Sequence, residues 1–253
     1  MADTVVSSIT VSKAGGARST DARERRFFLY MALITTLMIV LGFLPSFYLK
    51  DVIHAPPPLQ AITWVHGVVF TVWMLLFVTQ VTLIDRGSTA LHRRLGLVGA
   101  VLLGVVLAVG VTTGINAGRL GHAPPGSGAP LVFMVVPIAG ITATAVLFLA
   151  ALWNRARRDA HMRYMLAAFV TMTPPATGRI FIGAGLANQS LPIAFGIMDG
   201  LLAIAILYDL NARKSLHPAY LWSAFVYVAV QGVIVWAYNS PAWLSAAHWL
   251  VQT

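Results

Sequence analysis

The sequence predicts an all-α membrane protein: a seven-transmembrane helix bundle with its N-terminus inside, its C-terminus outside and a short interfacial C-terminal helix. Composition is the first observation, because 58% of the 253 residues are hydrophobic and only 10% are charged, against roughly a quarter charged in soluble domains. The second observation is the division of the chain into seven apolar segments. The third is the clustering of basic residues between alternate segments, which is typical of membrane topology signals.

Each apolar segment approaches or exceeds the roughly 20 residues that cross a bilayer core at about 1.5 Å per residue. The seven segments cover residues 27–49, 60–84, 91–117, 131–153, 161–187, 191–209 and 219–238. The sixth is the shortest. Residues 1–26 are polar and basic and predict a disordered cytoplasmic tail. Residues 27–238 form the transmembrane domain, and 239–253 an outer interfacial segment in which Ser240 caps a helix.

Basic residues set the orientation of the bundle. Lys50 and Arg119 lie on the side predicted to be outer. Most of the others fall on the inner side, in agreement with the positive-inside rule; they are Lys13, Arg18, Arg23, Arg25, Arg26, Arg86, Arg93, Arg94, Arg155, Arg157, Arg158, Arg163, Arg213 and Lys214. The net charge of +9 is therefore a topology signal. We expect the lipid bilayer, and no nucleic acid, as a partner.

Two charged residues lie deep within predicted spans, where a charge costs about 3 kcal/mol on insertion scales. Arg179 lies eight residues before the end of the fifth segment, and Asp199 eight residues after the start of the sixth, which places each roughly 12 Å below the outer boundary. Because the two segments are consecutive and antiparallel, the sequence predicts an Arg179–Asp199 ion pair. Pro174 and Pro175, just before Arg179, interrupt backbone hydrogen bonding and favour a cavity wall.

The second segment carries His66, Trp73 and Gln80 at seven-residue intervals. Seven residues is nearly two helical turns, so these residues share a face, which we expect to point inward. His66 would lie level with Arg179 and Asp199. Together these residues predict an outer-leaflet polar pocket that binds or moves a small solute, or relays protons. The alternative is a buried ion pair with a hydrogen-bonded histidine, which holds three helices in register.

His92 and His161 each open a segment at the inner side. They could bind one haem or metal ion, a lipid phosphate, or simply anchor their helices at the headgroups. The chain has no cysteine, which excludes iron–sulfur clusters and thiolate metal sites. Because no P-loop, dinucleotide fingerprint, zinc-protease motif or nucleophile elbow is present, we predict no catalytic residues and favour a protein that is not an enzyme. We expect no cofactor, with haem b on His92 and His161 as the alternative.

The pattern H-G, W, Q and LHRRLG over residues 66–96, with RRDAHMRYMLAAFVTMTPPATGRI over 157–180, resembles an uncharacterised family of bacterial polytopic membrane proteins. This resemblance implies a bacterial inner-membrane location and no assigned activity. The chain is more loosely similar to transmembrane b-type cytochromes of the ascorbate and ferric-reductase type. That similarity implies His66, His92 and His161 as haem ligands. His66 has no histidine at matching depth, which leaves His92 and His161.

Three functions therefore stay open. The chain binds or moves a small solute or protons through the pocket, or carries electrons as a b-type haem protein, or serves as a structural or assembly subunit of a membrane complex. The last would require a membrane-protein partner or a homo-oligomer.

Overall fold

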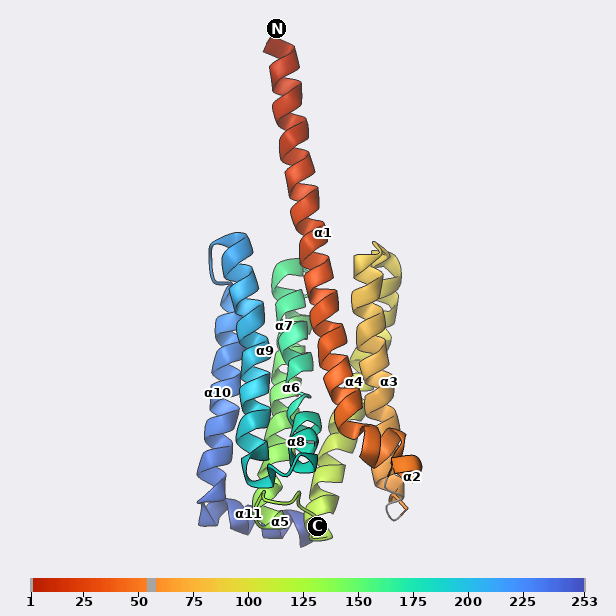
Figure 1. The fold of residues 1–253 in the computed structure, drawn as a ribbon, viewed down its shortest axis with the longest axis vertical. Helices are drawn as coiled ribbons and strands as arrows, with labels where there is room; N and C mark the ends of the chain where they lie inside the picture. The colour runs from red at the N-terminus through yellow and green to blue at the C-terminus, as the bar shows by residue number, and fades with distance from the viewer. Residues whose placement is uncertain (1, 54–57, 253) are drawn as a thin grey trace.

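The computed structural model describes residues 2–53 and 58–252, with side chains from Ala22 onward. Within these ranges all regular structure is helical, and Figure 1 shows the helices running side by side as a bundle. Seven segments are long and apolar enough to span a membrane: Ala22–Tyr48, Ala61–Asp85, Thr89–Arg119, Pro130–Trp153, Arg158–Gly183, Ala187–Arg213 and Pro218–Tyr238. The predicted seven-helix architecture is confirmed.

Several spans are built from more than one helical element. The elements in order are α1 Ala2–Phe43, the π-helix η1 Leu44–Tyr48, α2 Lys50–Ile53, α3 Ala61–Asp85, α4 Thr89–Arg119, α5 Pro130–Phe133, α6 Val135–Trp153, α7 Arg158–Val170, α8 Pro174–Gly183, the 3₁₀-helix η2 Ala187–Gln189, α9 Ser190–Arg213, α10 Pro218–Tyr238 and α11 Pro241–Gln252. The sixth span, expected to be the shortest, extends to Arg213 because Asp209 is buried within the bundle instead of ending the helix.

The N-terminal boundary also differs from the expectation. In the backbone, residues 2–26 continue α1 as a helix that projects beyond the bundle (Figure 1), where a disordered tail was predicted. The stretch over 17–26 contains alanine, arginine and glutamate, which favour a helix. The division into domains at residues 26 and 238 stays a prediction.

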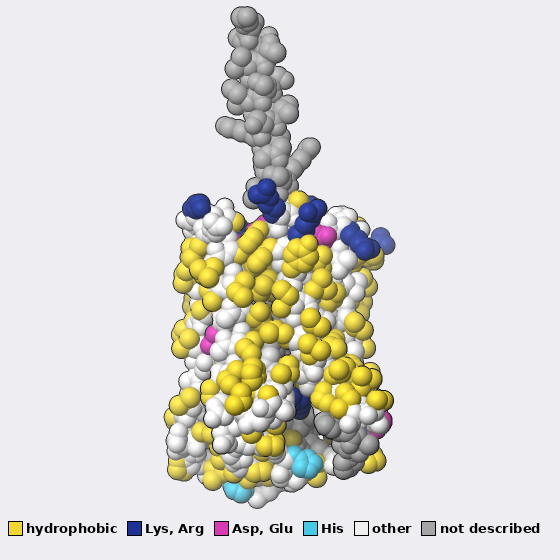
Figure 2. All heavy atoms as spheres, viewed as in Figure 1, with side chains coloured by type: hydrophobic (Ala, Val, Ile, Leu, Met, Phe, Trp, Pro, Cys, Tyr) yellow, Lys and Arg dark blue, Asp and Glu magenta, His cyan; other side chains and the backbone are white. Residues whose placement is uncertain are grey.

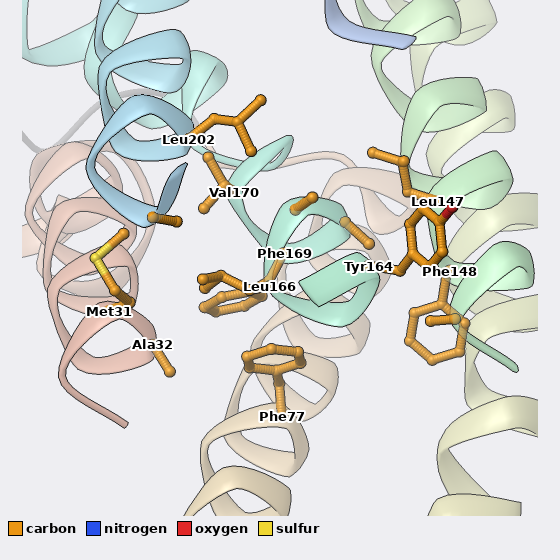
Figure 3. Close-up of a cluster of buried hydrophobic side chains, with 14 of the residues drawn as sticks. Met31, Ala32, Phe77, Leu147, Phe148, Tyr164, Leu166, Phe169, Val170 and Leu202 are labelled. Carbon is orange, nitrogen blue, oxygen red and sulfur yellow. The ribbon is translucent and has the colours of Figure 1, made fainter. Parts of the chain in front are cut away.

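One half of the bundle is filled by a continuous apolar core. Figure 3 shows Phe77 of α3 facing Phe169 of α7, and the two rings stack with centroids 4.0 Å apart. Trp73 packs against both rings, while Leu147 and Phe148 come from α6. These aromatic side chains bury large apolar areas and lock α3, α6 and α7 together.

Charge divides the two ends of the bundle. Figure 2 shows lysine and arginine side chains gathered at the end from which α1 projects, which we call the basic end. α11 lies across the opposite end (Figure 1). Its first turn is capped by Ser240, whose Oγ accepts a hydrogen bond from the Trp243 backbone N–H at 3.4 Å. Trp243 Nε1 donates to the Leu131 carbonyl at 3.1 Å, and Arg119 Nε donates to the Val251 carbonyl at 2.9 Å. These bonds hold the predicted interfacial helix against the bundle.

Candidate functional site

A cavity of about 450 Å³ occupies the half of the bundle away from the basic end. Its walls come from the first span, from α3, α4, α6, α8, α9 and α10 and from the break between α7 and α8, and they include His66 and Arg179. Figure 2 shows a hollow on this part of the surface with a basic side chain visible inside it. Most of the lining residues are aliphatic or aromatic, so the cavity is an apolar chamber with a few polar groups.

Two proline-containing interruptions shape the wall. Pro45 lies in η1, where the first span widens into a π-helix, and Ser46, Phe47 and Tyr48 of this turn line the cavity. Such π-bulges place side chains that a regular helix would point elsewhere. In the fifth span, helix α7 stops at Val170 and α8 starts at Pro174, because proline has no backbone N–H to continue the ladder. Pro174 and Pro175 line the cavity, as the sequence predicted.

A close helix crossing positions the cavity's arginine. A Cβ on Gly42 of α1 would lie 2.2 Å from the backbone oxygen of Ala176 in α8, so only glycine permits this approach. The contact brings the next residue, Phe43, over Arg179, whose guanidinium carbon lies 4.5 Å from the ring centroid. Arg179 Nη1 also donates to the Pro175 carbonyl at 2.7 Å. Both contacts orient the guanidinium without neutralising it.

The predicted Arg179–Asp199 ion pair is wrong. Asp199 accepts hydrogen bonds from Gln231 Nε2 at 2.9 and 3.0 Å and is exposed on the outer surface of the bundle. The prediction failed because it placed Asp199 on the wrong face of its helix. On α9 the inward residues are Ala194 and Met198, and Asp199 is rotated from Met198 by about 100°.

Arg179 consequently has no carboxylate partner. No aspartate or glutamate is found among the described residues that line the cavity, and no described acidic group lies within ion-pair distance of the guanidinium. The side chain of Arg179 is exposed, so a ligand that enters the cavity from outside the bundle can reach it. The cavity therefore has a fixed positive charge and room beside it.

Most other polar groups of the wall are satisfied by the protein. The hydroxyls of Tyr48 and Thr71 lie 2.9 Å apart, and those of Thr144 and Thr171 lie 2.6 Å apart. Tyr227 donates to a backbone carbonyl at 2.8 Å. Two lining atoms differ, since the Nδ1 of His66 and the Oγ of Ser46 are buried without a hydrogen-bond partner. Buried polar atoms of this kind usually bind a ligand or water, so Arg179, His66 and Ser46 are the groups available to a ligand.

The three residues spaced seven apart on α3, His66, Trp73 and Gln80, share an inward face, but they do not line one pocket. His66 lines the cavity and stacks on Phe70 with ring centroids 4.0 Å apart. Trp73 belongs to the apolar core, at 2% exposure, and Gln80 is buried close to the basic end. Seven-residue spacing gives a common face while it moves each residue about 10 Å along the axis. The structure thus brings His66 and Arg179 together, and it places Trp73, Gln80 and Asp199 outside the cavity.

A second polar cluster, which the sequence analysis missed, lies at the basic end. Arg163 of α7 is fully buried and pairs with Asp209 of α9, with Nε 3.1 Å from Oδ2. Its Nη2 also lies 3.0 Å from Oε1 of Glu24 in α1, and its guanidinium lies 5.7 Å from the Tyr220 ring centroid. The sequence does contain a signal for this pair. Asp209 lies near the inner end of the sixth segment, level with Arg163 near the inner start of the fifth. From the sequence, Arg163 was counted only among the inner basic residues that set the orientation of the bundle.

His92 and His161 are neighbours at this same end, with ring centroids 6.3 Å apart and planes at 82°. Each ring contacts a backbone carbonyl oxygen through Nδ1. Within the described ranges, no group of three or more His, Asp or Glu side chains is arranged to hold a metal ion.

No family model, curated protein or solved structure matches this chain. The fold and the cavity define a multi-pass membrane protein with an internal, apolar chamber and one unneutralised arginine. The ligand-binding roles of the residues predicted from the sequence stay predictions.

Proposed function

We propose that this protein binds a small amphipathic organic anion in the cavity, with the acidic group of the ligand against Arg179. The observation that carries the proposal is a guanidinium at membrane depth, oriented by Phe43 and the Pro175 carbonyl, in a cavity without a described acidic residue. A bound carboxylate or phosphate would supply the missing countercharge and hydrogen-bond acceptors.

The dimensions of the cavity support an organic ligand over a bare ion. Its volume of about 450 Å³ falls in the range of roughly 300–1,000 Å³ that is usual for small-molecule sites. The aromatic and aliphatic wall suits a hydrocarbon or ring portion, while His66 and Ser46 offer hydrogen bonds near the head group. Inorganic anions would leave most of this apolar wall in contact with water.

Location and orientation complete the proposal. By the positive-inside rule, the basic end faces the cytoplasm and the cavity lies in the outer half of the membrane. The bacterial inner membrane is inferred from the resemblance of the motifs over residues 66–96 and 157–180. A ligand would therefore be taken up from the outer side, either to be held there or to be moved inward.

Binding can be tested on the full chain in lipid nanodiscs. The probes are straight-chain carboxylates of about 4 to 12 carbons, compared with the uncharged alcohols of equal length, and the readout is the dissociation constant from calorimetry. We expect carboxylates to bind and Arg179→Gln to weaken them about 10- to 100-fold, because a hydrogen bond to a charged group contributes about 1.5–3 kcal/mol. Arg119→Gln, at an exposed arginine near the same end, is the matched control and should bind as the unchanged protein does. Equal affinity for alcohols and carboxylates, or unchanged binding by Arg179→Gln, would contradict the proposal.

A second candidate is a structural or assembly role, which the outward position of Asp199 favours. The Asp199–Gln231 pair faces the lipid, and neither Gly196 nor Gly200 on α9 has any atom within 4 Å of a built Cβ. A Gly-x-x-x-Gly face with polar neighbours permits close helix association in membranes, here with a second copy whose Gln231 could donate to Asp199. Light scattering on the detergent-solubilised protein should give a dimer, and Gly200→Leu should give a monomer; a monomer in both cases rejects this role.

A further inference from the structure

The two histidines at the basic end come from different spans and are fixed in a similar way. His92, in the first turn of α4, has its Nδ1 3.4 Å from the Gln80 carbonyl oxygen of α3. His161, in the first turns of α7, has its Nδ1 2.8 Å from the Ala151 carbonyl oxygen of α6. Four helices thus hold the two imidazoles 6.3 Å apart.

These hydrogen bonds determine the tautomer of each ring. A carbonyl oxygen can only accept, so Nδ1 of His92 and Nδ1 of His161 must each donate a proton. In the neutral imidazoles, both Nε2 atoms therefore carry lone pairs. Two such nitrogens cannot hydrogen-bond to each other, and neither has a partner among the described residues. An imidazole with Nδ1 bound to a carbonyl and Nε2 free is the usual form of a metal-ligating histidine.

Gln80 supplies a third candidate ligand atom. Gln80, whose carbonyl holds His92, is only 7% exposed, and its side-chain Oε1 is buried without a hydrogen-bond partner. Its amide nitrogen lies 3.9 Å from a Cβ built on Gly96, one helical turn after His92, so the amide group lies next to the face of α4 that carries His92. A buried amide oxygen without a hydrogen-bond partner destabilises the folded protein. Binding to a cation would remove this cost.

We propose that His92, His161 and Gln80 form a binding site for one first-row transition-metal ion of the kind that prefers imidazole nitrogen, such as Zn²⁺. A metal lies about 2.0–2.1 Å from each ligating nitrogen, which places the centroids of two imidazoles about 5 Å apart at the tetrahedral angle. The observed centroid distance of 6.3 Å is longer, so the proposal requires the two rings to move together by about 1 Å when the metal binds. Two nitrogens and one amide oxygen leave the fourth tetrahedral position for water.

The surrounding charges leave room for a cation. Arg93 and Arg94 follow His92 but are exposed, so their guanidiniums can reach lipid phosphates. This site is separate from the anion-binding cavity, which lies in the other half of the bundle. The two proposals can therefore fail independently.

The test uses the full chain with a purification tag that contains no histidine, stripped with a chelator and returned to nanodiscs. Zn²⁺ is titrated against a competing chromophoric chelator, and bound metal is counted by mass spectrometry. We expect one tight Zn²⁺ per chain, with a dissociation constant at least about 10-fold weaker in His92→Ala and in His161→Ala, and a smaller loss in Gln80→Leu. His122→Ala and His248→Ala, at other histidines, are the matched controls and should bind as the unchanged protein does.

X-ray absorption on the unchanged protein with Zn²⁺ bound keeps the proposal testable if the histidine variants do not fold. It should show two imidazole nitrogens at about 2.0 Å and at least one oxygen. Sub-stoichiometric Zn²⁺, equal binding by all variants, or a coordination shell without two imidazoles would overturn the proposal. A haem absorption band in the protein as purified, lost in both histidine variants, would also overturn it in favour of haem ligation.

Discussion

Arg163 and Arg179 lie on the same span, and the difference between them separates structure from binding. Arg163 is completely buried, with Asp209 and Glu24 as partners and Tyr220 beside it. Arg179 has one carbonyl and one aromatic ring, and no described carboxylate neutralises it. A neutralised, buried arginine joins helices, whereas an exposed arginine without a described carboxylate, beside a cavity, is available to an anion.

The packing around the two arginines follows the same division. The guanidinium of Arg163 lies beside the Tyr220 ring, and in the apolar core aromatic rings of α3, α6 and α7 fill the space between the helices (Figure 3). Near Arg179, the π-turn of η1 and the break between α7 and α8 open a chamber. The half with paired charges is therefore closed, and the half with the unpaired charge is hollow, as expected if only the second half receives a ligand.

The largest effect is expected from breaking the buried pair. Asp209→Asn should lower the free energy of unfolding by about 3–5 kcal/mol, because Arg163 would remain buried with its main countercharge removed. Unfolding in mixed micelles, followed by tryptophan fluorescence, measures this loss. Asp159→Asn is the control, since the Asp159 carboxylate is half-exposed and lies 3.2 Å from His217 Nε2 and 3.8 Å from Arg213. Loss of these exposed contacts should cost less than about 1 kcal/mol.

Replacing both charged residues by apolar ones tests whether the instability of Asp209→Asn comes from the unpaired charge of Arg163. The double change Arg163→Met with Asp209→Leu should recover most of the stability lost by Asp209→Asn, since apolar replacements of buried ion pairs are often neutral. If the double variant is as unstable as the single one, the ion pair is not what joins α7 and α9.

A middle-sized effect is expected at the crossing that orients Arg179. Gly42→Ala would place a Cβ 2.2 Å from the Ala176 backbone oxygen, which neither helix can avoid without moving. Overpacking of this kind costs about 1–3 kcal/mol, and the shift of α8 should also weaken carboxylate binding. Gly104→Ala is the control, because nothing lies within 4 Å of its Cβ, and it should leave both measurements unchanged. Equal stability of the two variants would mean that the helices do not approach closely at Gly42.

The sequence predicted the spans and the helix break of this bundle, but not the partners of its charged residues. Hydropathy and charge asymmetry predicted all seven spans, because length and the cost of charge in lipid act on each segment separately. The proline break before Arg179 was also predictable, since proline acts locally. The partners of charges were not, because depth along a helix leaves its rotation open. Asp199 and Met198 are adjacent in the sequence, yet Met198 lines the cavity and Asp199 is exposed on the outside of the bundle.

The smallest effect on stability is expected from Arg179→Met. This variant is also the most direct test of the difference between Arg163 and Arg179. The change removes a cation–π contact of about 0.5–2 kcal/mol and one hydrogen bond to the Pro175 carbonyl, but it also removes the cost of holding an unneutralised charge at membrane depth. These contributions oppose each other, so the free energy of unfolding without ligand should change by less than about 1 kcal/mol. Added carboxylate should stabilise the unchanged protein and leave the variant unaffected. If Arg179→Met instead destabilises the ligand-free protein as much as Asp209→Asn does, then Arg179 joins helices as Arg163 does, and the division between a structural and a binding arginine is lost.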